Sequence, residues 1–327
     1  MKILVTGGAG YIGSHCTRIL LDRGYSVTVI DNLSTGYEAA VDARATFYKG
    51  DIKNKEQLVS ILKQQAIEVV IHFAAFSLVG ESMKRPLKYY DNNVYGTKVL
   101  LDAMVEANVK SIVFSSTAAV YGEHETMPIT EAYAEEPTNT YGQTKLAMEQ
   151  MMKWVDQAHG VKYIALRYFN VAGAHASGVI GEAHNPETHL IPLILQVPNN
   201  QREFIHIFGD DYDTPDGTCI RDYIHIEDLI EAHILAMIHL IEHRQSDVFN
   251  LGSGSGYSVK EMIEAARRVT GHPIPAKVAP RRAGDPARLI ASSTKIEATL
   301  GWSRKYPNVE DIIRSAWVFH QSHKEGY

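Results

Sequence analysis

The chain has 327 residues, 45% hydrophobic and 21% charged, which suits one large α/β domain or two domains and excludes intrinsic disorder. Its formal net charge of −6 provides no basic field for nucleic acid or an anionic membrane, although a few arginines suffice for an anionic small molecule. Two cysteines exclude a disulfide framework, and no apolar run approaches the ~18 residues that span a bilayer, so we expect a cytoplasmic protein.

The first 170 residues alternate short β-branched runs with longer amphipathic stretches, a pattern typical of parallel strands joined by crossover helices. The expected strands are Lys2–Val5, Val27–Ile30, Thr46–Tyr48, Val69–Phe73, Ile112–Ser115 and Tyr163–Arg167. The expected helices are Ile12–Arg23, Lys55–Gln64, Leu87–Ala107 and Lys145–His159. This alternation predicts an α/β fold with a doubly wound parallel sheet, whose ligands bind beyond the carboxyl ends of the strands.

The character of the chain changes after Phe169, because residues 170–220 gather Gly, His, Asn and Pro in loop-like clusters. Periodic segments then return, and we expect further elements at Ile226–His243, Val248–Leu251 and Ser258–Val269. The sequence therefore predicts a main domain over residues 1–169 and a smaller C-terminal lobe over residues 170–327. Elements around residues 221–255 are expected to return to the main sheet.

A glycine-rich segment, Gly7–Gly8–Ala9–Gly10–Tyr11–Ile12–Gly13, follows the first strand directly and opens the first helix. Glycines suit this place because the turn is tight and a pyrophosphate must approach the backbone of the helix N-terminus. Asp31 ends the second strand ~20 residues later, where a carboxylate accepts a hydrogen bond from a ribose 2′-OH. Its neighbours Ile30 and Asn32 are not basic, so a 2′-phosphate would be repelled. We therefore predict a Rossmann-like site that binds NAD rather than NADP.

Two later strand ends are expected to complete this cofactor site. Asp51–Ile52 follow the third strand and Phe73–Ala74–Ala75 follow the fourth. The adenine and the rest of the dinucleotide would lie there, at the carboxyl edge of the sheet.

Tyr141 and Lys145 stand four residues apart at the start of a predicted helix, so both side chains project from one face. A phenol has a pKa of ~10, and action as a base near neutral pH requires a shift of about 3 units, roughly 4 kcal/mol. One positive charge ~4 Å away supplies about that much at an effective dielectric constant of ~20. We therefore expect Lys145 and an oxidised nicotinamide ring to lower the pKa of Tyr141. The strand end Ser115–Ser116–Thr117 precedes this pair.

The combination of GGAGYIG, a strand-end hydroxyl and the tyrosine–lysine pair resembles the extended short-chain dehydrogenase/reductase family. More specifically, SSTAAVYG, LRYFNVAGA and RDYIHIEDL are similar to the family of UDP-glucose (UDP-galactose) 4-epimerases, and the similarity extends through RRAGDPARL. The resemblance implies that Thr117 is the catalytic hydroxyl, Tyr141 the base and Lys145 the residue that activates it. The implied reaction interconverts UDP-glucose and UDP-galactose by reversible hydride transfer from sugar carbon-4 to tightly held NAD, through a 4-keto sugar.

The resemblance also assigns binding residues and an assembly. The candidate cofactor contacts are Gly7, Gly10, Tyr11, Ile12, Gly13, Asp31, Asn32, Asp51, Ile52, Phe73, Ala74, Ala75, Asn92, Ser115, Tyr141, Lys145 and Tyr168. The candidate UDP-sugar contacts are Thr117, Asn170, His189, Leu190, Arg221, Arg282, Asp285 and Leu289. Leu289 takes the place where a tyrosine excludes N-acetyl groups in relatives, so UDP-N-acetyl hexosamines are expected to be accepted to some degree. The helices near Leu87–Ala107 and Lys145–His159 resemble those of a four-helix interface, which implies a homodimer.

Three alternatives remain beside this interpretation. His239–Leu240–Ile241–Glu242–His243 matches the H-x-x-E-H zinc motif, but it has no evident third ligand, and we expect no metal site. A 4,6-dehydratase or another nucleotide-sugar epimerase shares the fold, but dehydratases follow the strand-end threonine with Asp–Glu. Here Ala118 and Ala119 stand at those positions and cannot transfer protons. A non-catalytic NAD-binding scaffold is disfavoured by the intact catalytic residues.

Overall fold

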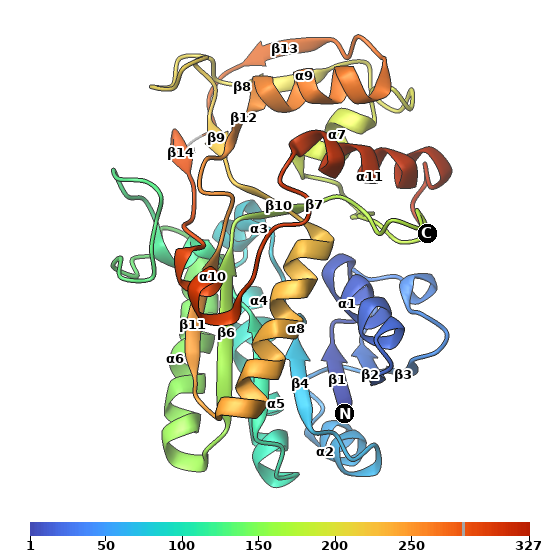
Figure 1. Cartoon of the computed structure of the whole chain (residues 1–327), viewed down its shortest axis with the longest axis vertical. Helices are drawn as coiled ribbons and strands as arrows, with labels where there is room; N and C mark the ends of the chain where they lie inside the picture. The colour runs from blue at the N-terminus through green and yellow to red at the C-terminus, as the bar shows by residue number, and fades with distance from the viewer. Residues whose placement is uncertain (283–284) are drawn as a thin grey trace.

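The computed structural model describes residues 1–282 and 285–327 (Figure 1). Within these ranges a seven-stranded parallel sheet has the order β11–β6–β5–β4–β1–β2–β3. Its strands are β1 (Lys2–Thr6), β2 (Ser26–Asp31), β3 (Thr46–Lys49), β4 (Val69–His72), β5 (Ser111–Ser115), β6 (Lys162–Tyr168) and β11 (Asp247–Leu251). The predicted doubly wound fold is confirmed.

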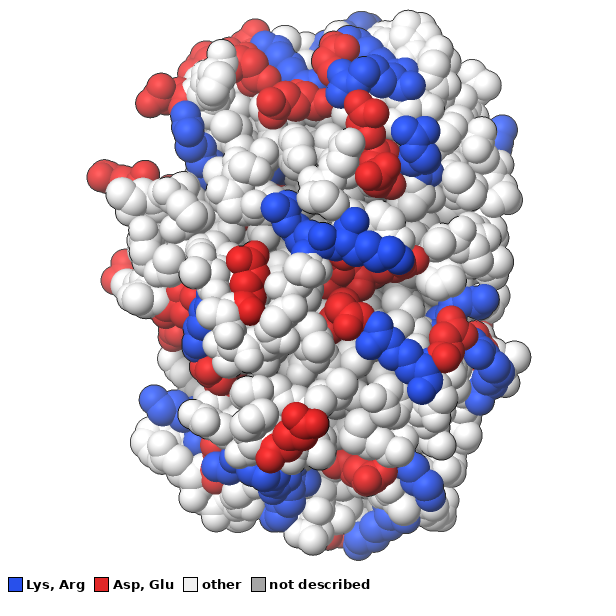
Figure 2. All heavy atoms as spheres, in the orientation of Figure 1, with Lys and Arg blue, Asp and Glu red and all other residues white. Residues whose placement is uncertain are grey.

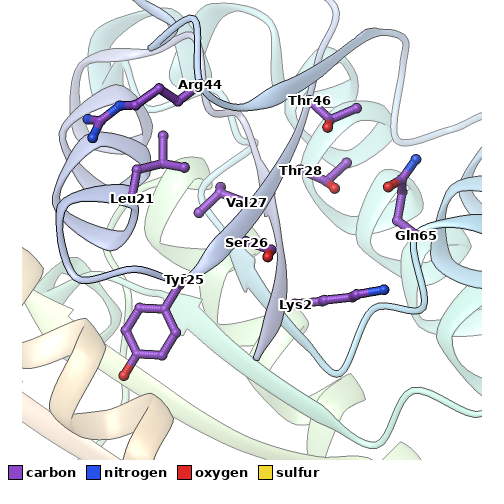
Figure 3. Close-up of a pocket in the computed structure, with 9 residues that line it drawn as sticks. All are labelled: Lys2, Leu21, Tyr25, Ser26, Val27, Thr28, Arg44, Thr46 and Gln65. Carbon is purple, nitrogen blue, oxygen red and sulfur yellow. The ribbon is translucent and has the colours of Figure 1, made fainter.

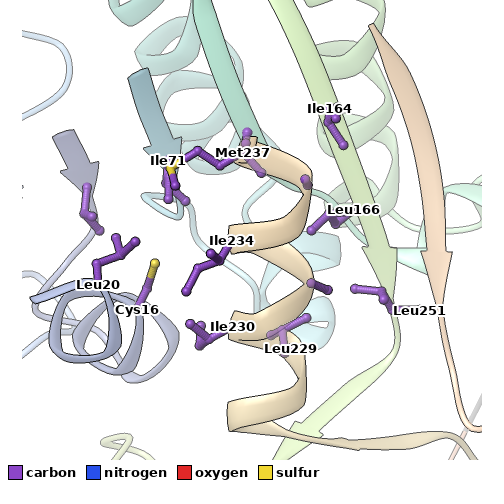
Figure 4. Close-up of a cluster of buried hydrophobic side chains, with 14 of the residues drawn as sticks. Cys16, Leu20, Ile71, Ile164, Leu166, Leu229, Ile230, Ile234, Met237 and Leu251 are labelled. Carbon is purple, nitrogen blue, oxygen red and sulfur yellow. The ribbon is translucent and has the colours of Figure 1, made fainter. Parts of the chain in front are cut away.

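Helices cover both faces of this sheet (Figure 1). On one face lie α1 (Tyr11–Asp22) and α8 (Ile226–His243), and on the other lie α2 (Lys55–Gln64), α5 (Gly96–Glu106) and α6 (Thr140–His159). Figure 4 shows how Leu20 of α1 and Ile230 and Ile234 of α8 meet between the two helices and the sheet. All three side chains are fully buried. Burying each contributes about 1.5–3 kcal/mol, so the helices are held by their apolar faces.

The expected single helix over Leu87–Ala107 is wrong, because the segment divides into three parts. The short helix α4 (Pro86–Tyr89) leads into the π-helical turn η2 (Tyr90–Tyr95), called the π-turn below, and α5 follows. The wide turn accompanies the buried amide of Asn93, which accepts a hydrogen bond from Phe76 N (2.9 Å) and donates one to Phe76 O (3.0 Å). A further helix, α3 (Val79–Lys84), precedes it and was not predicted.

The C-terminal lobe packs around its own apolar cluster, beyond the carboxyl edge of the main sheet (Figure 1). Its helices are α7 (Leu190–Leu195), α9 (Val259–Thr270) and α11 (Val309–Ser322), while α10 (Thr294–Leu300) packs against α8 and β11 of the main sheet. Small sheets pair β7 (Asn170–Ala172) with β10 (Tyr223–His225), β8 (Ile205–Phe208) with β13 (Ala276–Ala279), and β9 (Ile220–Arg221) with both β12 (Tyr257–Ser258) and β14 (Arg288–Leu289). The 3₁₀ turns η1 (Glu38–Ala40) and η3 (Ala118–Tyr121) complete the elements of the described chain.

The surface gives two further observations. Acidic and basic side chains are interspersed over the face shown in Figure 2. A hollow of about 400 Å³ lies at the amino ends of β1 and β2 and is lined by Lys2, Tyr25, Ser26 and Arg44 among others (Figure 3). This is the edge opposite the glycine-rich segment, so the hollow takes no part in the site described below.

None of the helices in the described ranges is long and apolar enough to cross a membrane.

Candidate active site

The glycine-rich segment forms the turn between β1 and α1, and its geometry requires glycine at two positions. Gly7 has φ +74°, and a Cβ there would lie 2.7 Å from Ala74 N. A Cβ on Gly13 would lie 2.1 Å from Gly7 O. The N-cap of α1 is Gly10, which has no capping side chain, and the first turn contains no acidic residue. The N-terminal amides of α1 are thus available to an anion, as a bound pyrophosphate requires.

The second predicted cofactor contact, Asp31, lies at the carboxyl end of β2 and is mostly buried. Its carboxylate accepts hydrogen bonds from Ala9 N (3.0 Å) and Leu33 N (2.7 Å), so it is anchored beside the glycine turn. Burial raises the pKa of Asp31, and the two backbone donors oppose this rise. Asn32 donates to Asp51 Oδ2 (3.0 Å), which joins the ends of β2 and β3.

The remaining predicted cofactor residues line the next strand ends. Phe73 follows β4 and stands against His233, with ring centroids 4.9 Å apart. Ser115 ends β5, and its hydroxyl shares a hydrogen bond with the Tyr168 hydroxyl at the end of β6. Asn92 lies in the π-turn and donates to Asn93 Oδ1 (3.0 Å). The structure thus places these residues at one edge of the sheet.

Tyr141 and Lys145 lie in the first two turns of α6, which begins at Thr140, earlier than the predicted Lys145. The helix is capped by Asn139, whose side chain accepts from Gly142 N (2.8 Å). Lys145 is almost fully buried and donates to Ser115 O (2.7 Å). Its Nζ lies 5.9 Å from the centre of the Tyr141 ring. The strand end, the lysine and the tyrosine are therefore assembled as the sequence indicates.

Burial dominates the electrostatics that the chain's own groups impose on this pair. Burial raises the pKa of Tyr141 to about 12, although the Thr117 hydroxyl opposes the shift. Burial also lowers the pKa of Lys145 to about 7, opposed by the charge of Glu149. Among the chain's own groups, desolvation of the buried phenolate therefore outweighs the hydrogen bond of Thr117. Ionising Tyr141 near neutral pH requires additional positive charge or hydrogen-bond donors.

Beneath the pair lies a buried ionic network that the sequence analysis missed. Glu149, one helical turn after Lys145, forms an ion pair with Arg167 and accepts a hydrogen bond from the Ser116 hydroxyl. Arg167 Nε is 3.0 Å from Glu149 Oε1, and both side chains are more than nine-tenths buried. The spacing of Tyr141, Lys145 and Glu149 at four-residue intervals was the available signal, since it places all three on one helix face.

Several predicted sugar-nucleotide residues lie together in the C-terminal lobe. Arg221 of β9 forms an ion pair with Asp285. Leu289 of β14 is half-buried and stands opposite Arg221 in the β9–β14 register. Arg282 places its guanidinium carbon 4.1 Å from the centre of the Phe208 ring. Residues 283–284 of the predicted Arg282–Asp285 motif lie outside the described residues.

Asn170 lies where β6 gives way to β7, between the two lobes. Its side-chain amide donates to Asp222 O (3.0 Å). Asp222 is buried, and its carboxylate accepts from Ser253 N (2.6 Å) and Ala291 N (2.9 Å). This aspartate therefore fastens the loop after β11 and the segment after β14 to β9 and β10, a structural function that the sequence did not indicate.

His189 occupies the N-cap position of α7, immediately before Leu190, but its imidazole makes no capping hydrogen bond and contacts Glu182 instead. Nδ1 of His189 lies 2.5 Å from Glu182 Oε1, and this buried carboxylate raises the pKa of His189 to about 9. Glu182, His184, Glu187 and His189 bring four possible ligand atoms within 4.8 Å of one another. The sequence analysis singled out only His189 of this group.

The H-x-x-E-H motif makes no comparable cluster in the described residues. His239 and His243 stack on each other at the C-terminal end of α8, with ring centroids 4.1 Å apart. His243 Nδ1 lies 3.1 Å from His239 O, so the imidazole hydrogen-bonds a carbonyl in the last turn of α8.

Comparison with known proteins gives consistent matches over the whole chain. The model of the NAD dependent epimerase/dehydratase family matches residues 3–252. A UDP-glucose 4-epimerase of Halalkalibacterium halodurans is 58% identical over 327 residues, covering 100% of this chain and 98% of that protein. A crystal structure of UDP-glucose 4-epimerase superposes with a TM-score of 0.98 at 57% identity, covering 100% of this chain and 99% of the other. The enzyme of Bifidobacterium longum in complex with NAD⁺ and UDP has a TM-score of 0.93 at 39% identity, with both chains fully covered.

Proposed function

Because this chain belongs to the NAD-dependent epimerase/dehydratase family, we propose that it is a UDP-glucose 4-epimerase, an NAD-dependent isomerase that interconverts UDP-glucose and UDP-galactose. The observation that carries the proposal is the assembly of Thr117, Tyr141 and Lys145 at the carboxyl edge of the sheet, beside an uncapped glycine turn. We further propose that residues 1–169 with the returning strand β11 bind NAD, and that residues 170–327 otherwise bind the UDP-sugar.

The described residues fit an NAD molecule. A side chain on Gly7 or Gly13 would collide with backbone atoms, so only glycine fits at these two positions. The uncapped N-terminus of α1 beside them suits a pyrophosphate. The anchored carboxylate of Asp31 suits a ribose diol and disfavours a 2′-phosphate. When bound, NAD⁺ supplies the hydride acceptor for sugar carbon-4 and a positive charge near the site.

Tyr141 would accept the proton of the sugar 4-hydroxyl, and Thr117 would hold that hydroxyl by a hydrogen bond. Lys145 stabilises the tyrosinate electrostatically, while its own position is fixed by Ser115 O and by the nearby charge of Glu149. The proton returns from Tyr141 when hydride is delivered to the opposite face of the 4-keto sugar. The hexose must turn between these steps, so the chain has to hold the UDP group more firmly than the sugar.

The C-terminal lobe offers suitable groups for UDP. Arg221 and Arg282 supply guanidinium donors for phosphate oxygens, and the Asp285 carboxylate can accept from ribose hydroxyls. Arg221 and Asp285 neutralise each other in an ion pair, which substrate binding would exchange for contacts with the UDP group. The remaining candidate contacts lie nearby in the chain. Asn170 begins β7, and His189 and Leu190 lie at the start of α7.

A 4,6-dehydratase is disfavoured by the residues after Thr117. Ala118 is fully buried, and the Ala119 amide donates to the Thr117 hydroxyl (3.1 Å). No acid or base is present at these two positions to eliminate water. The epimerase is therefore the function that these positions support.

We also propose some acceptance of UDP-N-acetyl hexosamines. Leu289 is half-buried beside Arg221 and lacks the ring and hydroxyl of a tyrosine, which leaves more room for a 2-substituent. The main substrate pair remains UDP-glucose and UDP-galactose.

A homodimer is supported by exposed apolar side chains on the helices that follow β4 and β5. Leu87 is 81% exposed and Trp154 is 66% exposed, and exposed apolar patches mark protein–protein interaction sites. Both lie on the α4–α6 side of the sheet, where two copies would bury them.

The two unpaired buried cysteines, Cys16 and Cys219, are consistent with a reducing, cytoplasmic compartment.

The decisive experiment incubates the purified protein with UDP-galactose and no added cofactor. We expect UDP-glucose to accumulate to equilibrium, and denaturation of the protein to release NAD in a one-to-one ratio. Release of NADP alone would refute the cofactor assignment. A 4-keto-6-deoxy product would identify a dehydratase, and bound NAD without turnover would identify a scaffold.

A further inference from the structure

The loop between β7 and α7 gathers two glutamates and two histidines, of which only His189 is also a candidate UDP-sugar contact. Glu182, His184, Glu187 and His189 each direct one donor atom into a space where all four atoms lie within 4.8 Å of one another. We propose that these four side chains form a binding site for one divalent transition-metal ion, with Zn²⁺ as the best match. The proposal shares His189 with the candidate UDP-sugar contacts, but metal binding can be measured without the reaction.

The donor set is chemically appropriate. Two imidazole nitrogens and two carboxylate oxygens are common ligands of Zn²⁺, which favours four ligands in a tetrahedron at ~2.0–2.2 Å. Ligand atoms around such an ion stand roughly 3.3 Å apart. Nδ1 of His184 lies 3.1 Å from Glu182 Oε1 and 3.9 Å from Glu187 Oε2, and Nδ1 of His189 lies 3.6 Å from Glu187 Oε1. The 2.5 Å contact between His189 and Glu182 would open by under about 1 Å around an ion.

A second observation concerns His184, whose Nδ1 is buried and makes no hydrogen bond within the described residues. Its contact with Glu182 has a suitable distance but not the angles of a hydrogen bond. A buried ring nitrogen without a partner is unfavourable, and it is rare in folded proteins. A metal ion at the centre of the group would satisfy it.

The charges of the cluster point the same way. The side chains of Glu182 and Glu187 are 4% and 8% exposed, so two carboxylates are withdrawn from water in one place. Within the described residues the ion-pair partners of these two carboxylates are His184 and His189, and neither carboxylate pairs with a lysine or an arginine. One divalent cation with two neutral imidazoles neutralises both carboxylates.

The position of the site indicates a structural function. All four ligands come from the protein, which leaves no open position for a substrate and is typical of structural zinc. The His184 ring meets Tyr11 of α1 edge-on, with centroids 6.3 Å apart, and Tyr11 in turn donates to Gly173 O (2.7 Å). An ion here would fasten the loop before α7 against the glycine turn. His189 would bind it through Nδ1 and keep Nε2 available to the substrate.

The test measures metal binding by the full-length holoenzyme after dialysis against a chelator. Zn²⁺ is titrated against a competing chromophoric chelator, and Co²⁺ absorption reports the coordination geometry. We expect one equivalent per chain with Kd below about 10⁻⁶ M, and intense tetrahedral Co²⁺ bands. His184→Ala and Glu187→Gln should each weaken binding by at least about 100-fold.

His239→Ala is the matched control, because it removes a histidine from the H-x-x-E-H motif of α8 and should leave binding unchanged. Far-UV circular dichroism and NAD content verify that each variant is folded, and Glu187→Gln decides the result if His184→Ala fails to fold. The proposal is overturned if the wild type binds less than one equivalent at about 10 µM Zn²⁺. It is equally overturned if both cluster variants bind like the wild type, or if only His239→Ala loses the ion.

Discussion

Lys145→Met tests whether the buried lysine supplies the charge that allows Tyr141 to ionise. The Lys145 Nζ lies 5.9 Å from the Tyr141 ring centre, and both groups are buried. At an effective dielectric constant of ~20, one charge at that distance contributes about 3 kcal/mol, equivalent to about 2 pH units. The interaction is reciprocal, so an ionised Tyr141 also helps to keep Lys145 charged at neutral pH although its pKa alone is about 7.

The assay follows conversion of UDP-galactose to UDP-glucose between about pH 6 and 10. We expect the rate of Lys145→Met at pH 7 to fall about 100-fold. The acidic limb of its pH–rate profile should move up by about 2 pH units. Lys153→Met is the control, since Lys153 is exposed on the same helix. An acidic limb within half a unit of the wild type would refute the electrostatic argument.

The same variant should gain stability. The pKa of Lys145 falls from 10.5 in the unfolded chain to about 7 in the folded one, so the unfolded chain binds more protons between these values. Wild-type stability therefore rises with pH across that window, and the buried charge is most unfavourable below pH 7. Lys145→Met should exceed the wild type in urea midpoint at pH 6, and the difference should narrow by pH 9. A constant difference would contradict the assigned protonation.

Three further predictions concern other parts of the site. Tyr141→Phe should lower turnover by at least ~10² with NAD content unchanged, and near-normal turnover would show that another group is the base. Leu289→Tyr should suppress turnover of UDP-N-acetylglucosamine while UDP-galactose turnover changes little; equal loss for both, or no wild-type activity on the N-acetyl substrate, would exclude Leu289 as the gate. Glu149→Gln should cost about 3 kcal/mol of unfolding free energy in urea, because it neutralises the buried one of the two carboxylates that pair with Arg167, whereas the other, on Glu135, is 39% exposed. Arg44→Met, which breaks an exposed ion pair, should leave the urea midpoint unchanged. An equal loss of stability in Arg44→Met and Glu149→Gln would contradict the importance of burial.

The main sheet could be predicted because buried parallel strands are continuous apolar runs. The expected strands agree with the structure to within one residue at each end, as at β2 and β5. Helix α7 was not predicted, and Pro192 lies in its first turn, where the missing N–H costs nothing. Helix α3 and the π-turn were missed because a six-residue helix and a local widening leave no clear periodicity.

The site residues were predictable where short motifs encode geometry, as in the glycine turn and at Tyr141. Burial depth is not encoded in a motif, so the rise that burial imposes on the pKa of Tyr141 could not be predicted. The grouping of Glu182, Glu187 and the two histidines depends on the path of an irregular loop. Such a path follows from tertiary contacts rather than from residue spacing.

The placement of β11 at the edge of the main sheet governs how the chain can be synthesised and divided. Strand β6 ends at Tyr168 and its neighbour β11 begins at Asp247, so roughly 80 residues leave the ribosome between the two. Until then β6 is an unpaired apolar edge, which is prone to pair with other chains. A fragment cut at residue 169 should therefore aggregate rather than fold, and a nascent chain should need chaperone protection until α8 and β11 have emerged.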